Sequence, residues 1–355
     1  MIRMELIKEN KKLLKRLSDT KLINMNVADA LLFVYQNELH PYKNEIQRII
    51  ETRKVNEIQA LYLWLTDRLE IDLNDYDSLK ISNRYFLANI HKQKLEKYTE
   101  NPYVKAISNV NINEKNYSLK TLAYKPYQLF PLDDLIIDEK DYFSEYTPIG
   151  FFDKKYNYLA LLENKRIWMS LNPNEINTMA PHIDRASGNI LVLGLGLGYF
   201  PFMCSLKDEV KTITIIERDQ NIINLFQKYL LDKFPYKNKN KIIRDDAILY
   251  LEENHDYDYI FADLWHDSID GLQAYLKLKN IQEKHHLNMS YWLENSFSAY
   301  LRRIAISILN KEDDNFVEES FYKEIYLKLK EAINSSNKDL LTLLSEKELL
   351  QMALK

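Results

Sequence analysis

The chain has 355 residues, of which 46% are hydrophobic and 28% are charged, and its formal net charge is −4. This composition is ordinary for a folded globular protein, and the length predicts roughly two to three domains. The small net charge gives no overall attraction to nucleic acid or to an anionic membrane. The most apolar long stretch, residues 190–204, is shorter than the ~20 residues that span a bilayer. Because no apolar signal core follows the first methionine, we expect a cytoplasmic protein with no membrane segment.

Residues 1–120 are expected to be helical. Apolar residues at helical spacing predict helices through residues 6–17, 27–39 and 42–69, and a proline ends the second of these. Over residues 1–21 there are seven basic and three acidic side chains. We interpret this excess as the solvated face of a helix, against the alternative of an arm that binds nucleic acid or a partner.

Helical periodicity fades over residues 117–148, where prolines and the acidic stretch 133–141 predict a connector with short strands. Asn172 followed by Pro173 predicts the first turn of a helix that continues to about residue 186. Between these regions, three short segments predict a small antiparallel meander with polar turns. They are residues 149–152, 156–162 and 166–170.

The clearest motif is a glycine turn in the middle of the chain. The protein has six glycines, and three of them are Gly194, Gly196 and Gly198. They follow the apolar run 190–193, which predicts a buried parallel strand, and they precede an apolar segment with Pro201 near the start of a helix. Glycine lets a ligand approach the main chain closely, and a helix start offers free N–H groups. The alternative is a tight turn without a ligand. We favour a ligand site, because turn geometry rarely needs three alternating glycines.

Acidic residues follow the next three predicted strands. Strands that alternate with helices predict a Rossmann-like, doubly wound and mostly parallel α/β sheet, in which ligands bind at the carboxyl ends of the strands. An acid at the tip of the second strand can accept hydrogen bonds from ribose hydroxyls. The pattern Gly-x-Gly-x-Gly differs from the dinucleotide pattern Gly-x-Gly-x-x-Gly, which makes NAD the poorer fit. The three acids are Glu217, Asp246 and Asp263, after the strands predicted at 211–216, 242–243 and 257–262.

The rest of the chain predicts a helix over residues 270–279, one short strand within 285–291, and further helices. Because no final pair of strands is visible, we expect a truncated sheet that is capped by helices.

The single cysteine, Cys204, excludes an intrachain disulfide and is expected to be a core thiol. The expected organisation is a helical N-terminal domain, a linker with a small antiparallel β region, a Rossmann-like ligand-binding domain and a helical C-terminal extension. Their ranges are 1–120, 121–187, 188–292 and 293–355.

Residues 148–292 resemble the class I S-adenosylmethionine-dependent methyltransferase fold, and in particular its spermidine synthase branch, the aminopropyltransferases. Residues 191–199 are similar to the glycine motif of that fold, and residues 213–219 are similar to its acidic second strand. Asp245-Asp246-Ala247 resembles the family's Gly-Asp-Ala. The segment Tyr-Asp-Tyr-Ile-Phe-Ala-Asp, residues 257–263, resembles its Tyr-Asp-x-Ile-x-x-Asp strand. The resemblance implies that S-adenosylmethionine, or decarboxylated S-adenosylmethionine, is the cofactor.

The resemblance also implies a role for each residue of the motifs. The glycine turn would pass close to the methionine part of the cofactor, and Glu217 would bind the ribose hydroxyls. Asp246 would accept a hydrogen bond from the adenine amino group, with Ala247 beneath the ring. Asp263 would face the sulfonium and the acceptor amine. The implied cofactor-binding residues are Gly194, Leu195, Gly196, Gly198, Glu217, Arg218, Asp246, Ala247 and Asp263.

The sequence departs from the synthases at two places. They carry a second Asp three residues after the fourth-strand Asp, where this chain has His266, with Asp267 one residue further. Their Asp after the third glycine has no counterpart here. We expect Asp263 to orient an amine, His266 to act as a base and Trp265 to stack on a cationic or planar substrate. The alternatives are that Trp265 packs in the core and that His266 makes a surface hydrogen bond. The catalytic candidates are therefore Asp263, His266 and Asp267.

Four functions remain open from the sequence. The first is an S-adenosylmethionine-dependent methyltransferase of unknown acceptor, and the second is an aminopropyltransferase. The third is a non-catalytic nucleotide-binding module whose helical termini hold a protein partner, and the fourth, an NAD-dependent oxidoreductase, fits worst. The expected acceptor is a small or amine-bearing molecule, and the sequence leaves open whether the chain forms a homodimer.

No motif indicates nucleic acid. No metal site is expected, because the adjacent His285 and His286 would point in different directions on a helix.

Overall fold

The computed structural model describes residues 2–114, 116–312 and 320–354. Across these ranges, five strands form one fully parallel sheet in the order β12-β11-β10-β13-β14. This order confirms the Rossmann-like α/β fold, and it ends without the antiparallel strands that would extend a longer sheet. The strands are β10 (Gly188–Leu193), β11 (Val210–Glu217), β12 (Asn240–Arg244), β13 (Tyr259–Ala262) and β14 (Met289–Tyr291).

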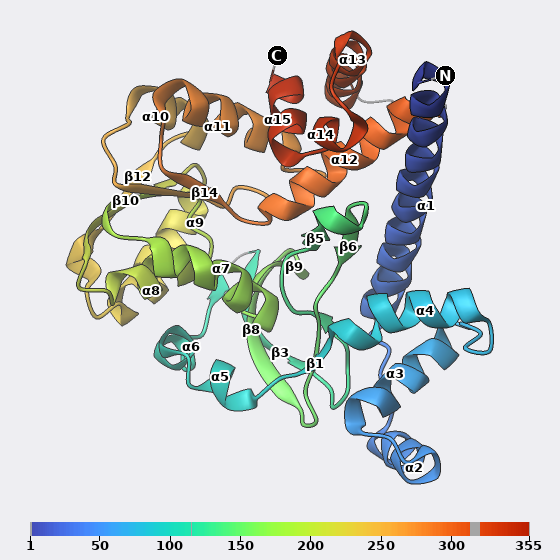
Figure 1. The fold of residues 1–355 in the computed structure, drawn as a ribbon. Helices are drawn as coiled ribbons and strands as arrows, with labels where there is room; N and C mark the ends of the chain where they lie inside the picture. Colours follow the sequence, from blue (N-terminus) through green and yellow to red (C-terminus); the bar gives the residue numbers. More distant parts are fainter. Residues whose placement is uncertain (1, 115, 313–319, 355) are drawn as a thin grey trace.

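Helices cover both faces of this sheet. Figure 1 shows α10 and α11 on one side and α7 and α8 on the other. Both faces of β10 are therefore buried, which explains its continuous apolar run. The side chains of Asn172, Asp219 and Asp246 accept backbone N–H groups at the starts of α7, α9 and α10. The helices are α7 (Pro173–Arg185), α8 (Tyr199–Ser205), α9 (Gln220–Leu225), α10 (Ala247–Glu253) and α11 (Leu272–His285), and α9 continues as a short π-helix over Phe226–Leu230.

The β region before the core sheet differs from the expected meander. The hairpin of β8 (Tyr156–Glu163) and β9 (Arg166–Ser170) is confirmed. However, residues 117–124, which the sequence assigns to a connector, form the long strand β3 (Tyr117–Tyr124), and β3 pairs along the whole of β8. Stacked rings of Tyr124 and Tyr158, 4.9 Å apart, support this pairing. A short strand, β2 (Asn113–Glu114), completes the antiparallel sheet β2-β3-β8-β9.

The segment expected to open the meander, β7 (Ile149–Phe151), belongs to another sheet. It lies between the parallel strand β1 (Ile90–Lys92) and the antiparallel strand β4 (Phe130–Pro131). Ile149 and Phe151 are fully buried in a second hydrophobic core, together with apolar residues of the N-terminal helices. Residues 1–120 are therefore not purely helical, since they contain β1, β2 and the start of β3.

The N-terminal helices also differ in their boundaries. The two helices expected within residues 6–39 form one continuous helix, α1 (Ile2–Gln36), because no glycine or proline interrupts it. The helix expected at 42–69 is broken at Lys54, whose φ of +54° is left-handed. The helices that follow α1 are α2 (Lys43–Arg53), α3 (Glu57–Arg68), α4 (Tyr76–Tyr85), α5 (Leu95–Thr99) and α6 (Pro102–Ile107).

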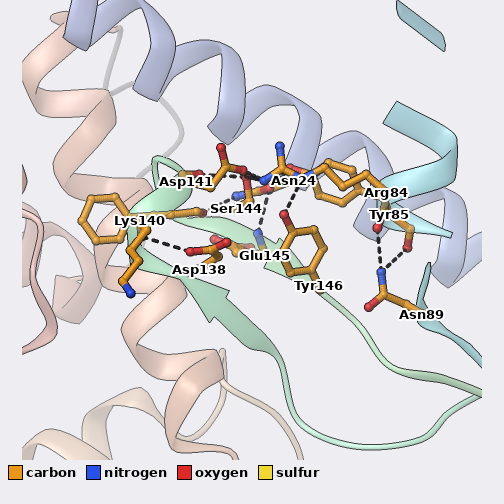
Figure 2. Close-up of polar contacts among 11 residues, drawn as sticks. Asn24, Arg84, Tyr85, Asn89, Asp138, Lys140, Asp141, Ser144, Glu145 and Tyr146 are labelled. Carbon is orange, nitrogen blue, oxygen red and sulfur yellow. Dashed lines mark hydrogen bonds and ion pairs between the residues drawn. The ribbon is translucent and has the colours of Figure 1, made fainter. Parts of the chain in front are cut away.

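The acidic connector is a hairpin, β5 (Ile136–Asp138) and β6 (Ser144–Tyr146), that a polar network holds against the helices. Figure 2 shows Asn24 of α1 at the centre of this network. The Asn24 side chain accepts from the Tyr85 hydroxyl at 3.0 Å and from the Glu145 backbone N–H at 3.1 Å, and it donates to the Phe143 carbonyl at 3.0 Å. We call these residues the Asn24 network. An ion pair between Arg84 and Asp141 gives α4 a second contact with the same cluster.

The C-terminal helices pack on α1 and on the sheet domain. Figure 1 shows α1 along one side of the molecule, reaching from these helices to α3 and α4. Arg303 of α12 forms an ion pair with Glu145, which joins the C-terminal helices to the β5–β6 hairpin. No described helix combines the length and the apolar character that crossing a membrane requires. The helices are α12 (Glu294–Asn310), α13 (Ser320–Ser335), α14 (Leu340–Leu343) and α15 (Glu346–Leu354).

Candidate cofactor and acceptor site

A cavity of about 400 Å³ lies at the carboxyl ends of the parallel strands. This volume is within the range of small-molecule sites in proteins. The glycine turn after β10 forms part of its wall, and the residues that follow β11, β12 and β13 form further parts. The side chains of Trp168 and Met169 on β9, Glu175 on α7 and Trp292 close other sides. The predicted residues that line the cavity are Gly194, Leu195, Gly196, Gly198, Glu217, Arg218, Asp246, Ala247, Asp263 and His266.

The three glycines of the turn have different structural roles. All three have positive φ angles: +99° at Gly194, +55° at Gly196 and +82° at Gly198. A Cβ atom at Gly194 would overlap the carbonyl oxygen of Asp263, and one at Gly198 would overlap the ring of Phe226. A Cβ at Gly196 would meet only the Met169 sulfur, 3.7 Å away, which is an ordinary contact. Protein packing therefore explains two of the glycines, and only Gly196 leaves space that a ligand can use.

Glu217 braces the glycine turn from the end of β11. Its carboxylate accepts the backbone N–H of Leu195 at 3.2 Å and that of Asp219 at 2.8 Å. Each carboxylate oxygen can accept a second hydrogen bond, so this bracing is compatible with binding of ribose hydroxyls. The neighbouring Arg218 is exposed at the rim of the cavity.

Asp246 has a structural role as well as its position on the cavity wall. It is the N-cap of α10, where its Oδ1 accepts from the backbone N–H groups of Ile248 at 2.9 Å and Leu249 at 3.1 Å. Its Oδ2 has no protein partner within the described part of the chain. Ala247, the first residue of α10, is buried beside it. One oxygen is therefore available to a ligand while the other holds the helix.

Two carboxyl groups of the cavity wall, those of Glu175 and Asp263, interact electrostatically, and the sequence reasoning identified only Asp263. Burial raises the pKa of Asp263 to about 7, an effect that nearby His266 partly opposes. Burial and then the negative charge of Asp263 raise the pKa of Glu175 to about 8. Glu175 lies in the first turn of α7. Acids are common there because their negative charge interacts favourably with the positive end of the helix dipole. No sequence pattern therefore distinguishes Glu175 from an ordinary helix-start residue.

The loop after β13 places the remaining candidates at different depths. His266 lines the cavity with a largely exposed side chain, 65% accessible. Trp265 is buried, and its Nε1 donates to the Trp292 carbonyl at 3.1 Å, which supports the packing role that the sequence left as an alternative. Asp267 does not line the cavity. Its Oδ1 instead accepts from the backbone N–H groups of Ile269 at 2.7 Å and Asp270 at 3.1 Å, so it caps the loop.

Other reactive side chains lie away from this cavity. Cys204 is buried in α8, where burial raises the pKa of its thiol to about 12. His285 stacks on His255 with ring centres 3.8 Å apart. Within the described ranges, no group of three or more His, Cys, Asp or Glu side chains is arranged to hold a metal ion.

The charges on the cavity wall are unequal. Arg218 is the one permanently cationic side chain among the described lining residues. The lining carboxyl groups are those of Glu175, Glu217, Asp245, Asp246 and Asp263. The raised pKa values of Glu175 and Asp263 favour their neutral forms, but three further carboxyl groups still outnumber the one permanent cation. Such a wall attracts a positively charged ligand and disfavours an additional carboxylate.

A scan against models of protein families and a search of curated proteins find no match to this chain. Among solved structures, it is similar to spermidine synthase from Thermotoga maritima and to a spermidine synthase in complex with the transition-state analogue AdoDATO. Each is 14% identical, with a TM-score of 0.31, and the match covers 42% of this chain and 60% of the other. The chain therefore spans less than two thirds of the length of these proteins. The fold class rests on the strand order described above.

Proposed function

We propose that this chain binds S-adenosylmethionine at the cavity and transfers its methyl group to an amine-bearing small molecule. The observation that carries the proposal is the convergence of three features. They are the open space at Gly196, the carboxylates at three strand ends, and the electrostatically coupled carboxyl groups of Glu175 and Asp263 in the cavity wall. Glu217 and Asp246 would hold the ribose and the adenine with the oxygen positions that their structural bonds leave free.

The residues of the cavity suit transfer to nitrogen. When bound, S-adenosylmethionine supplies a methyl group on a cationic sulfur, which the lone pair of a neutral amine attacks. The carboxyl groups of Asp263 and Glu175 lie where they can hold a cationic acceptor by charge-assisted hydrogen bonds. Because burial raises the pKa of Asp263 to about 7, its carboxylate binds a proton more readily than an exposed one. The site can therefore both bind an ammonium group and help to remove its proton.

Aminopropyl transfer from decarboxylated S-adenosylmethionine is the second candidate, and the charge of the wall favours it. S-adenosylmethionine carries a carboxylate, whereas its decarboxylated form does not. Apart from Glu175 and Asp263, whose raised pKa values favour the neutral form, three lining carboxyl groups stand against Arg218 as the permanent cation, so the described wall suits the decarboxylated form electrostatically.

A turnover assay tests the proposal and separates the two candidates. The purified chain is incubated with S-adenosylmethionine or its decarboxylated form, and with putrescine or spermidine as the amine. Release of S-adenosylhomocysteine supports methyl transfer, and release of methylthioadenosine supports aminopropyl transfer. Asp263→Asn should lower either rate by about 100-fold or more, whereas the exposed Asp256→Asn should leave it unchanged. Binding of both sulfonium compounds with no turnover of either would instead favour a non-catalytic module.

A further inference from the structure

The loop that joins β13 to α11, residues 263–271, is held from two sides. The buried ring of Trp265 leaves no room for a side chain at position 271, where a Cβ atom would clash with it, so Gly271 is required there. From α13, the Tyr322 hydroxyl donates a hydrogen bond to the Ile269 carbonyl. His266 is therefore presented to the cavity from an anchored loop. The C-terminal helix α13 therefore contributes to holding this loop in place.

Within this loop, the Asp270 carboxylate contacts both the backbone and the ring of His266. Oδ1 accepts from the backbone N–H groups of His266 at 3.1 Å and Asp267 at 3.0 Å. Oδ2 lies 3.1 Å from His266 Nδ1. An ionised carboxylate only accepts hydrogen bonds, so Nδ1 must carry the proton in this contact. In the neutral ring, Nε2 is then the atom that is free to accept a proton.

We propose that Asp270 is a positioning residue that fixes His266 in the tautomer whose Nε2 accepts the proton of the acceptor amine. The inference rests on the proposed function. In the transfer, the amine nitrogen forms a bond to the transferred carbon, and the carbon–sulfur bond breaks with its electron pair passing to sulfur. Asp263 takes the earlier proton that converts the ammonium form of the acceptor to the neutral amine, and the proton that the alkylated nitrogen then carries leaves for His266 Nε2. The Asp270 carboxylate stabilises the resulting imidazolium through the Nδ1 hydrogen bond.

The contrast with Asp267 separates this role from simple loop capping. Both acids accept backbone N–H groups of the loop, but only Asp270 contacts the imidazole. Asp270→Asn keeps one oxygen for the backbone donors and places an amide NH₂ group opposite Nδ1. Because that NH₂ group donates, Nδ1 must become the acceptor and the proton moves to Nε2. Asp267→Asn preserves an oxygen acceptor for its turn and leaves the ring contact intact.

The test uses the full chain with ¹⁵N-labelled histidine and follows the His266 ring nitrogens by NMR, together with turnover of the sulfonium donor. We expect a protonated Nδ1 in the wild type and in Asp267→Asn, and a protonated Nε2 in Asp270→Asn. The last variant should lose about 10- to 100-fold in kcat with KM nearly unchanged. An unaltered tautomer, or equal turnover in both variants, overturns the positioning role. Calorimetry with S-adenosylhomocysteine separates failure of the positioning role from failure of the proposed function. If the wild type does not bind this ligand, the proposed function itself is overturned.

Discussion

Gly196 and Glu175 define the site at the scale of single residues. Gly196 is the glycine whose missing side chain leaves room at the cavity rather than inside the protein. The Glu175 carboxyl is less acidic in the folded chain than in water, since burial and the charge of Asp263 raise its pKa to about 8. A buried carboxyl with a raised pKa destabilises the fold at neutral pH, and such groups gather at functional sites.

Glu175→Gln should stabilise the protein at alkaline pH. The folded pKa of about 8 lies above the unfolded value near 4.5, so folding favours the protonated carboxyl. Wild-type stability is therefore full below the unfolded pKa and falls as pH rises toward the folded one, while glutamine does not titrate. Thermal unfolding should show equal stabilities near about pH 4 and a variant more stable by roughly 1–3 kcal/mol at about pH 8.5.

The control for this prediction is Glu252→Gln, which replaces an exposed acid on α10. It should show no difference between the two pH values. A Glu175→Gln variant that loses stability at alkaline pH, or that retains full turnover, would contradict the role of Glu175 in the site.

Residue positions could be predicted from the sequence only where they follow a strand. Glu217 and Asp263 stand directly after apolar runs, and parallel strands bring their carboxyl ends to one edge. Glu175 and Asp270 carry no such mark. Glu175 comes to the cavity because α7 packs beside the sheet, and Asp270 contacts His266 through the shape of a loop. Local sequence does not encode either contact.

At the scale of elements, α10 shows how a helix start can serve the fold and a ligand together. Asp246 caps α10 with Oδ1, and Ala247 lies buried at the first position. The N-terminus of α10 is thereby fixed at the cavity wall. The cap uses Oδ1, so the adenine contact that we propose for Asp246 would use Oδ2.

Asp246→Ala and Asp246→Asn should separate these two requirements. Alanine removes the cap and should cost about 1 kcal/mol of unfolding free energy, whereas asparagine caps nearly as well. If Asp246 also holds the adenine amino group, both variants should bind S-adenosylhomocysteine less tightly, alanine by roughly tenfold or more. Chemical denaturation and calorimetry measure the two effects. Unchanged affinity in both variants would leave Asp246 with its capping role alone.

Elements were predictable where the pattern is local. The central strand β10 has a continuous apolar run, and α7 has an N-cap followed by proline, so both agree with the structure. β7 was misassigned because its partner β1 lies about 60 residues earlier, and no local pattern shows that pairing. β3 was missed for the same reason, since its partner β8 comes after an intervening hairpin.

At the scale of the whole molecule, the Asn24 network and its ion pair to Arg303 join four elements of the chain. Asn24 on α1 bonds to Tyr85 at the end of α4 and to the β5–β6 hairpin (Figure 2). Arg303 of α12 pairs with Glu145 of that hairpin. The cluster is mostly buried, so each polar group depends on its partners. None of these residues lines the cavity.

Asn24→Ala should therefore lower stability without altering the site. The change leaves the Tyr85 hydroxyl, the Glu145 N–H and the Phe143 carbonyl without their buried partner, which should cost about 2–4 kcal/mol. Urea unfolding measures this loss, and the exposed Asn26→Ala on the same helix is the matched control. Affinity for S-adenosylhomocysteine should stay within about twofold of the wild type. A large loss of affinity in the folded variant would show that the network reaches the cavity.

Calorimetric titration with S-adenosylhomocysteine tests the account most directly, using the wild type and Gly196→Asn. Asparagine tolerates a left-handed backbone, so the variant should fold while its side chain fills the space at the cavity. We predict binding to the wild type with a dissociation constant near or below about 100 µM, and roughly tenfold or weaker binding to the variant. Absence of binding to the wild type at millimolar ligand, or equal affinity in a folded Gly196→Asn, would contradict the account.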